Sequence, residues 1–178
     1  MAYIGQSLRR FEDQRLLTGA SSYVDDLQLP GMLHALVLRS PYAHALIKGI
    51  DTAAATRVPG VVAVFTAEDF AGIIENLPTR TNTDADQMQP PPHPVLALGK
   101  TAYVGQAVAI LVADSPASTR DGLEQIEVDY EPLPALVDPE EAIAENAPLL
   151  HDHLGTNIAL CTINAGGDLD GAFAQADR

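Results

Sequence analysis

His151 and His153 are two of the five histidines in this 178-residue chain, and they are the pair whose spacing could bind a metal ion. On a strand, residues two apart project from one face, so both rings could reach the same ion. No third ligand follows at a motif spacing, and the surrounding Pro-Leu-Leu-His-Asp-His stretch is typical of a loop. We therefore interpret them as exposed loop histidines and name no metal ligand.

Ser40 and His44 could act as nucleophile and general base in a hydrolase. The sequence contains no Gly-x-Ser-x-Gly elbow and no identifiable acid that would orient the histidine. This hydrolase hypothesis predicts ester cleavage that Ser40→Ala abolishes. His34 lies in an apolar run, and we interpret it as a hydrogen-bonded histidine of the core or of a sheet edge.

Glu127, Asp129 and Glu131 alternate with apolar residues and would stand about 7 Å apart along a strand. This separation is too large for two carboxylates that share a proton, and no calcium-loop pattern is present. We interpret the row as a solvated face, and Asp25 with Asp26 as a turn or capping pair. No nucleophile, base and oxyanion donors come together, so no catalytic residue is named.

Gly166, Gly167 and Asp168 precede a helical pattern, where backbone N–H groups could cradle a phosphate. No Gly-x-Gly-x-x-Gly and no Gly-Lys-Ser/Thr motif accompanies them, so capping by Asp168 is a sufficient explanation and no cofactor-binding residue is named. Cys161 is the only cysteine, which excludes an intrachain disulfide. We interpret it as a small buried hydrophobic residue.

The charge is strongly negative and unevenly distributed. The formal net charge is −14; residues 1–113 carry ten acids against eight Lys and Arg, whereas residues 114–178 carry fourteen acids against two Arg. Such a surface repels phosphate backbones and argues against nucleic acid as a partner. The N-terminus has no basic-then-apolar leader, and the longest apolar run, 107–113, is too short to span a bilayer. A cytoplasmic location is the simplest expectation.

Apolar runs and turn signals predict an α+β domain behind an extended N-terminal arm, with a mixed sheet and short helices. We expect a third strand buried on both faces, a bent strand or strand pair around Gly105, and an alternating strand with an acidic outer face. Asp114 or Ser115 would cap a helix that begins at Pro116. The predicted strands are 32–38, 46–51, 61–65, 101–104 with 107–113, and 126–131; the predicted helices are 52–58, 116–125, 139–146 and 169–176.

Two segments point beyond a single compact domain. Residues 71–99 have no sustained periodicity and contain a run of prolines, which is typical of a functional loop or a docking surface. The eight-residue helix at 169–176 has an apolar stripe and is too short to be stable alone in water. Either this helix folds back on the domain, or it begins a second domain that the chain does not contain.

Several segments in a fixed order resemble the start of the molybdenum-binding large subunit of the xanthine dehydrogenase, aldehyde oxidase and carbon monoxide dehydrogenase family. Four positions depart from the family's usual pattern, with Ser21 in place of Gly, Leu46 in place of Arg, Gln106-Ala107 in place of Glu-Pro, and Gly122 in place of Ala. These changes affect which subfamily the chain resembles. They do not affect the resemblance to the family as a whole. The segments that carry the resemblance are RFED (10–13), RLLTG (15–19), YVDD (23–26), LPGMLHA (29–35), RSPYAHA (39–45), PGVVAV (59–64), YVG (103–105) with VA (108–109), EVDYEPLPA (127–135), GD (167–168) and AFA (172–174).

The resemblance implies an α/β hammerhead-like domain, with residues 1–31 as an arm, 32–147 as the hammerhead domain, and 148–178 as a linker and the start of a molybdopterin-binding domain. Complete members oxidise aldehydes, N-heterocycles or carbon monoxide with a molybdenum-pterin cofactor. Iron-sulfur clusters and FAD lie on their partner chains or domains.

The pterin-contacting glycine-rich loops and the catalytic Glu of that family are not found in these 178 residues. We therefore expect a structural domain that is inactive on its own. The alternative is a stand-alone, non-catalytic binding module that has lost the molybdenum domains. The substrate, the electron acceptor, the subfamily and the oligomeric state are not determined by these residues.

Overall fold

A computed structural model describes residues 3–78, 91–161 and 166–176, and they separate into two units, Met1–Leu33 and His34–Arg178. The first unit contains α1 (Asp13–Leu17) and the 3₁₀ helix η1 (Val24–Asp26), neither of which has a buried residue. The Tyr23 N–H donates to the Asp26 carboxylate at 2.8 Å, so Asp26 serves as the predicted capping residue. Ser21 does not have a positive φ.

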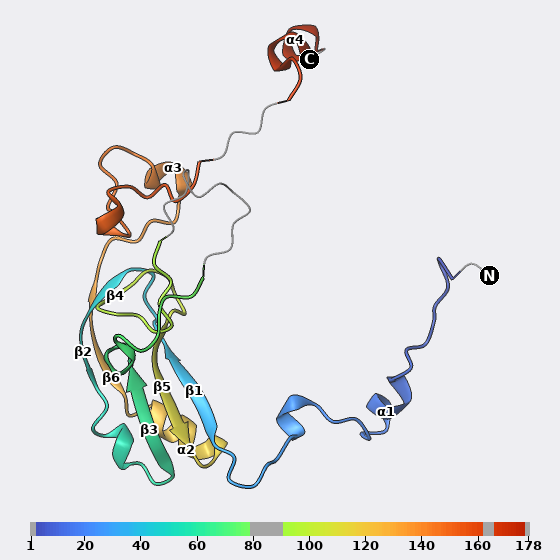
Figure 1. The fold of residues 1–178 in the computed structure, drawn as a ribbon, viewed down its shortest axis with the longest axis vertical. Helices are drawn as coiled ribbons and strands as arrows, with labels where there is room; N and C mark the ends of the chain where they lie inside the picture. The colour runs from blue at the N-terminus through green and yellow to red at the C-terminus, as the bar shows by residue number, and fades with distance from the viewer. Residues whose placement is uncertain (1–2, 79–90, 162–165, 177–178) are drawn as a thin grey trace. The chain divides into compact units, whose positions relative to one another are not determined.

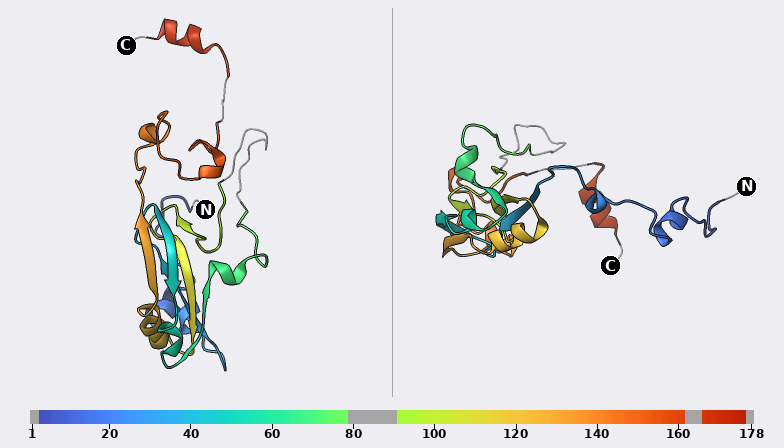
Figure 2. Two further views of the ribbon diagram at one scale, coloured as in Figure 1. Left: turned by 90° about the vertical axis from the view of Figure 1, so that its left-hand side faces the viewer. Right: turned by 90° about the horizontal axis from the view of Figure 1, so that it is seen from below.

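Six strands in the second unit form two three-stranded antiparallel sheets, shown in Figures 1 and 2. Sheet A has the order β1-β5-β3, and sheet B has the order β4-β2-β6. The α+β class is confirmed, with two antiparallel sheets where one mixed sheet was expected. The strands are β1 (His34–Arg39), β2 (Ala45–Asp51), β3 (Val61–Thr66), β4 (Lys100–Thr101), β5 (Ala107–Ala113) and β6 (Glu127–Pro132).

The core lies where β5 faces both sheet B and α2 (Pro116–Leu123). Ala109, Leu111 and Ala113 alternate along β5 and are fully buried, as the two-residue period of a strand requires. Ile50 of β2 and Val128 of β6 pack against this cluster, so the apolar faces of the two sheets share one core.

Helix α2 begins as the sequence predicts. The Ser115 hydroxyl accepts from the Ser118 N–H at 3.1 Å, and Pro116 takes the first helical position. Gly122 lets this helix approach β5 and β3 closely, because a Cβ there would lie 2.7 Å from Leu111 Cδ1 and 2.8 Å from Val61 Cγ2. The close approach gives a physical reason for Gly at this position.

Further short helices complete the fold. Helix α4 (Leu169–Gln175) is capped by the Asp168 carboxylate, which accepts from the Gly171 N–H at 3.0 Å. No helix in the described parts of the chain is long and apolar enough to cross a membrane. The remaining elements are η2 (Ala55–Arg57), η3 (Ala67–Phe70), α3 (Pro139–Ala142), η5 (Asp152–Leu154) and α4 (Leu169–Gln175).

Three predictions about individual elements were wrong. Strand β3 is an edge strand of sheet A and is half-buried rather than buried on both faces, with Val62 59% exposed. Strands β4 and β5 are not one bent strand or a pair, because β4 pairs with β2 while β5 pairs with β1 and β3. Helix α3 ends at Ala142.

A turn through Gly105 separates β4 from β5. Gly105 has a φ of +86°, in the region that favours glycine. The Ala102 N–H donates to Gln106 Oε1 at 2.7 Å, and the Arg39 guanidinium donates to the Gly105 carbonyl at 2.9 Å. The chain therefore changes sheets here. Residues 79–90 of the predicted loop lie outside the described residues.

Candidate functional site

A cavity of about 590 Å³ opens beside β4, within the size range of small-ligand sites. Its walls come from the 91–98 segment, from β4 and the turn after it, and from the segment around η5. Both apolar and ionisable side chains line it. They are Pro91, Pro92, His93, Pro94, Leu98, Lys100, Ala102, Tyr103, Gln106, Leu150, His151, Asp152 and His153.

An ion pair lies on the wall of this cavity. Lys100 Nζ is 2.7 Å from Asp152 Oδ2, and the side chains are 21% and 80% exposed, respectively. The hydrogen bond and charge of the Lys100 ammonium lower the pKa of Asp152. The lysine is thus held on a strand of sheet B, while its acidic partner lies on a solvent-exposed turn.

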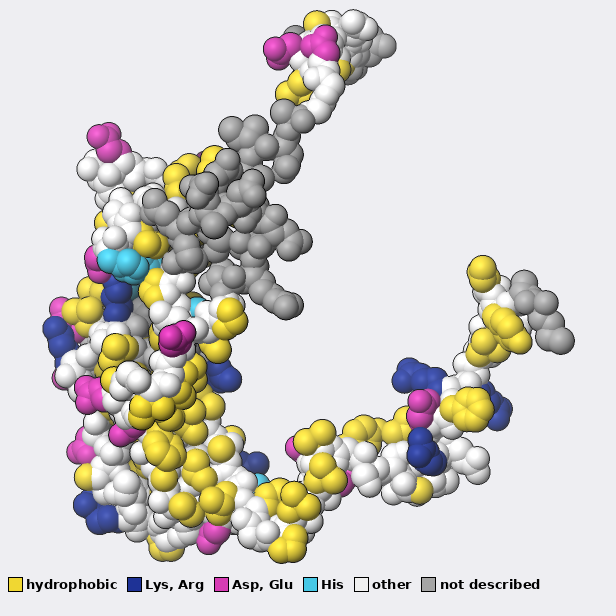
Figure 3. All heavy atoms as spheres, viewed as in Figure 1, with side chains coloured by type: hydrophobic (Ala, Val, Ile, Leu, Met, Phe, Trp, Pro, Cys, Tyr) yellow, Lys and Arg dark blue, Asp and Glu magenta, His cyan; other side chains and the backbone are white. Residues whose placement is uncertain are grey.

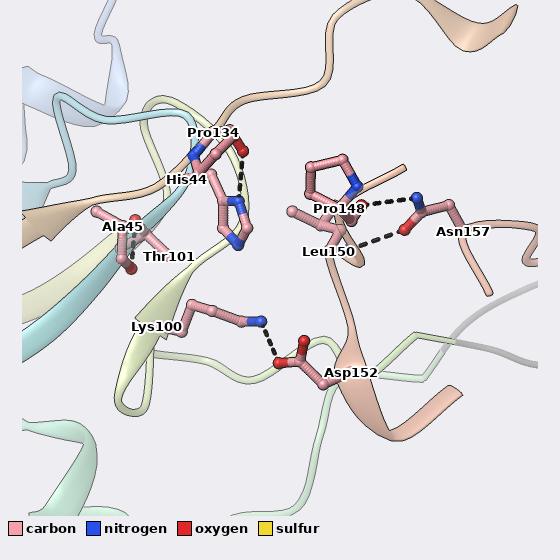
Figure 4. A network of polar contacts seen from close by, with 9 residues as sticks. All are labelled: His44, Ala45, Lys100, Thr101, Pro134, Pro148, Leu150, Asp152 and Asn157. Atoms are coloured by element: carbon pink, nitrogen blue, oxygen red, sulfur yellow. Dashed lines mark hydrogen bonds and ion pairs between the residues drawn. The ribbon is translucent and has the colours of Figure 1, made fainter. Parts of the chain in front are cut away.

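Asn157 fixes the segment that carries this turn (Figure 4). Its side-chain oxygen accepts from the Leu150 N–H at 2.9 Å. Its amide donates to the Pro148 carbonyl and to the Ala142 carbonyl, both at 2.9 Å. One amide side chain therefore satisfies three backbone groups of an irregular segment, which positions η5 with His153 in it and His151 at its N-cap.

His44 lies behind the cavity and is 7% exposed. Its Nδ1 is 2.8 Å from the Pro134 carbonyl oxygen, which can only accept, so the proton is assigned to Nδ1. Nε2 is buried and has no hydrogen-bond partner among the residues that the structure describes. Figure 4 shows that this side of the ring is turned toward Lys100 and Asp152.

His151 lies in a positive local field. Burial lowers the pKa of His151 below 6.5, and the neighbouring His153 and Lys100 lower it further, against the opposing effect of Asp152. The rings of His151 and His153 are 6.1 Å apart, edge to face. Within the described part of the chain, no three His, Cys, Asp or Glu side chains are arranged to hold a metal ion.

The hydrolase arrangement of Ser40 and His44 does not form. The Ser40 hydroxyl donates to the Tyr42 carbonyl at 3.0 Å and accepts from the Tyr42 N–H, so it closes a tight turn. The His44 ring is held by Pro134 instead. A serine and a histidine four residues apart are thus separated by the turn between them.

The other candidates have structural positions. His34 lies on β1, an edge strand of sheet A. The three acids of β6 are exposed, as predicted for a solvated face, and Glu131 pairs with Lys48 at 2.6 Å. The prediction for Cys161 was wrong, because this residue is exposed.

Lys100, Asp152 and Asn157 were missed by the sequence reasoning. Lys100 and Asp152 are 52 residues apart, and no local motif connects them. The position of Asp152 between two histidines could have marked it as a candidate. Its partner Lys100 is identified only by the three-dimensional structure.

The sequence profile described as aldehyde oxidase and xanthine dehydrogenase, a/b hammerhead domain, matches residues 18–134. The chain is 39% identical over 183 residues to the 6-hydroxypseudooxynicotine dehydrogenase complex subunit gamma of Paenarthrobacter nicotinovorans, covering 99% of this chain and 22% of that protein. It is 43% identical over 152 residues to the carbon monoxide dehydrogenase large chain of Afipia carboxidovorans, covering 85% and 18%.

The solved structure of quinoline 2-oxidoreductase from Pseudomonas putida 86 superposes with a TM-score of 0.82 at 40% identity, over 97% of this chain and 22% of that one. The fold is therefore that of an α/β hammerhead domain. The chain belongs to the aldehyde oxidase and xanthine dehydrogenase family, and it spans about a fifth of the length of these relatives.

Proposed function

We propose that this chain is the N-terminal structural domain of a molybdenum hydroxylase large subunit and that it has no catalytic activity alone. The observation that carries the proposal is the match of residues 18–134 to the hammerhead domain, in a chain that spans only about a fifth of its relatives. In the complete enzyme, the reaction would be oxidation of an aldehyde, an N-heterocycle or carbon monoxide. Residues 32–147 would form the hammerhead domain, and 148–178 would lead into the molybdenum-binding part.

Sheet A supports a scaffolding role because both of its faces are apolar. Val37 of β1 and Phe65 of β3 pair with Ile110 of β5 on the side away from Leu111, and all three are half-buried. Hydrophobic side chains gather over this region in Figure 3. A sheet with two apolar faces is typical of the middle layer of a larger assembly. We infer that the outer face packs against another part of the large subunit.

The molybdenum-pterin cofactor would be held by other parts of the complete subunit, and iron-sulfur and FAD-binding chains or domains would accept its electrons. The described residues of this chain offer no metal-binding cluster, and the cavity beside β4 contains an ammonium and a carboxylate already paired with each other. They do not fit the cofactor, and we assign no step of its chemistry to them.

Metal analysis tests the proposal. The 178-residue chain and a complete large subunit of the family would be produced side by side in a host that makes the cofactor. We expect molybdenum near background in the short chain and near one atom per chain in the complete subunit. Stoichiometric molybdenum in the short chain, or substrate oxidation by it, would overturn the proposal.

A further inference from the structure

We propose that the cavity beside β4 binds a carboxylate carried on an apolar stem, with Lys100 as the group that pairs with the carboxylate. This inference does not depend on the function proposed above. It rests on the paired groups at the cavity wall, on the buried imidazole behind them and on the apolar lining.

The Lys100–Asp152 pair shows which chemistry the wall accepts. A carboxylate oxygen already lies 2.7 Å from Lys100 Nζ. The Asp152 side chain is 80% exposed, so it can turn into water at little cost. Lys100 sits on β4 with its side chain 21% exposed, so it stays in place when its partner leaves. Asp152 therefore occupies the position that an incoming carboxylate would take.

Imidazole groups surround this position. His93, His151 and His153 line the same cavity as Lys100. The buried Nε2 of His44, which carries the lone pair in the assigned tautomer, is turned toward Lys100 (Figure 4). One lysine and three histidines thus line a cavity in which Asp152 is the one acid among the described residues, although the chain has a net charge of −14. An anion entering here would meet the Lys100 ammonium and imidazole N–H groups as hydrogen-bond donors.

Apart from His93, Tyr103 and Gln106, the rest of the lining is apolar, which defines the stem. Rigid pyrrolidine rings and aliphatic groups form a wall that loses no hydrogen bonds when a hydrocarbon covers it. A free organic acid or an acidic side chain of another polypeptide would present the same group. The apolar residues of the wall are Pro91, Pro92, Pro94, Leu98, Ala102 and Leu150.

Ligand titrations of the 178-residue chain, followed by NMR of the His151 and His153 ring signals, test this site. Isobutyrate and its neutral isostere isobutyramide form one pair of probes. Acetyl-Leu-Glu-Leu-amide and acetyl-Leu-Gln-Leu-amide form the other. We expect saturable shifts with at least one carboxylate probe and none with its amide. The tighter of the two carboxylate probes identifies the source as a free acid or a polypeptide side chain.

Two substitutions should act in opposite directions. Lys100→Gln removes the charged donor and should weaken binding of the carboxylate by about tenfold, because hydrogen bonds to charged groups are the stronger kind. Asp152→Asn removes the competing carboxylate and should tighten binding several-fold. Lys48→Gln, which breaks the exposed Lys48–Glu131 pair elsewhere on sheet B, is the matched control and should change nothing.

The opposite changes in carboxylate affinity distinguish a binding site from a purely structural ion pair. If the pair were only structural, Lys100→Gln and Asp152→Asn would have the same effect, because either substitution breaks it. Backbone amide spectra would verify that each variant keeps the fold. The proposal fails if neither carboxylate saturates, if the amides bind equally well, or if Lys100→Gln binds as tightly as the parent chain.

Discussion

Sheets A and B share one topology, three antiparallel strands, but they differ in what their central strands bury. In sheet A, β5 is fully apolar, and its residues facing the core have no solvent exposure. In sheet B, β2 begins with the buried Ala45 but exposes Lys48 and Gly49. Beside it, β4 bears Lys100 and β6 exposes a row of acids.

This difference gives the two sheets different roles in the domain. Apolar burial of about 25 cal/mol per Å² makes sheet A the main source of stability, because its central strand is covered by neighbours, by α2 and by sheet B. Sheet B is half apolar and half polar, and its strand β4 supplies Lys100, whose side chain lines the cavity. The molecule thus separates the residues that hold the fold from those that could meet a ligand.

The largest expected effect is that of Leu111→Ala at the centre of sheet A. Leu111 has 0% exposure, so truncation should lower the free energy of unfolding by about 2–5 kcal/mol. Leu46→Ala at the half-buried centre of sheet B should cost less than half as much, and Val62→Ala at the exposed edge should stay within about 0.5 kcal/mol of the parent. Urea unfolding measures all three. Equal losses for Leu111 and Leu46 would refute the division of roles.

Gly122→Ala should be a smaller perturbation of sheet A. Alanine favours a helix interior by about 1 kcal/mol, but its Cβ would overlap Leu111 and Val61, and overpacking costs about 1–3 kcal/mol. We expect net destabilisation of up to about 2 kcal/mol.

The Leu111→Ala background tests this explanation, because the clash partner is then shorter. In a double-mutant cycle, the cost of Gly122→Ala should fall or change sign in that background. Additive effects of the two substitutions would show that the contact with Leu111 does not set the cost.

The smallest effect concerns His151 beside sheet B. Burial lowers its pKa in the folded chain below 6.5, so between that lowered pKa and 6.5 the unfolded chain binds more protons than the folded one. The free energy of unfolding should therefore decline as the pH falls below about 6.5. His151→Gln should flatten this decline in urea titrations, whereas His34→Gln, on the edge of sheet A, is the comparison. An unchanged slope in His151→Gln would contradict the assigned cause.

Much of the fold could be predicted from local patterns. The strands at β1, β2, β5 and β6 were predicted near their observed bounds, because each has an apolar run or a two-residue alternation bounded by turn residues. The caps at Ser115 and Asp168 were predicted because a capping side chain bonds to a backbone N–H only a few residues away. The burial of β3 was misjudged because composition does not tell an edge strand from a central one.

The candidate site was not predictable in the same way. Lys100 and Asp152 lie 52 residues apart, and His44 is joined to Pro134 across 90 residues. Such contacts depend on which strands become neighbours. The pattern of residue types did not predict the order of the strands. The exposure of Cys161 was missed for the same reason, since a small apolar-like side chain is buried only if another element covers it.

Residue order alone determined the family of this protein, the caps and most strand positions, because each of these is set by residues within a short stretch of the sequence. Only the tertiary structure decided that β4 and β5 enter different sheets and that an ammonium, a carboxylate and three imidazoles meet beside one cavity. The physical reason is that pairing between distant segments is chosen by burial of the whole chain, which no short stretch of sequence encodes.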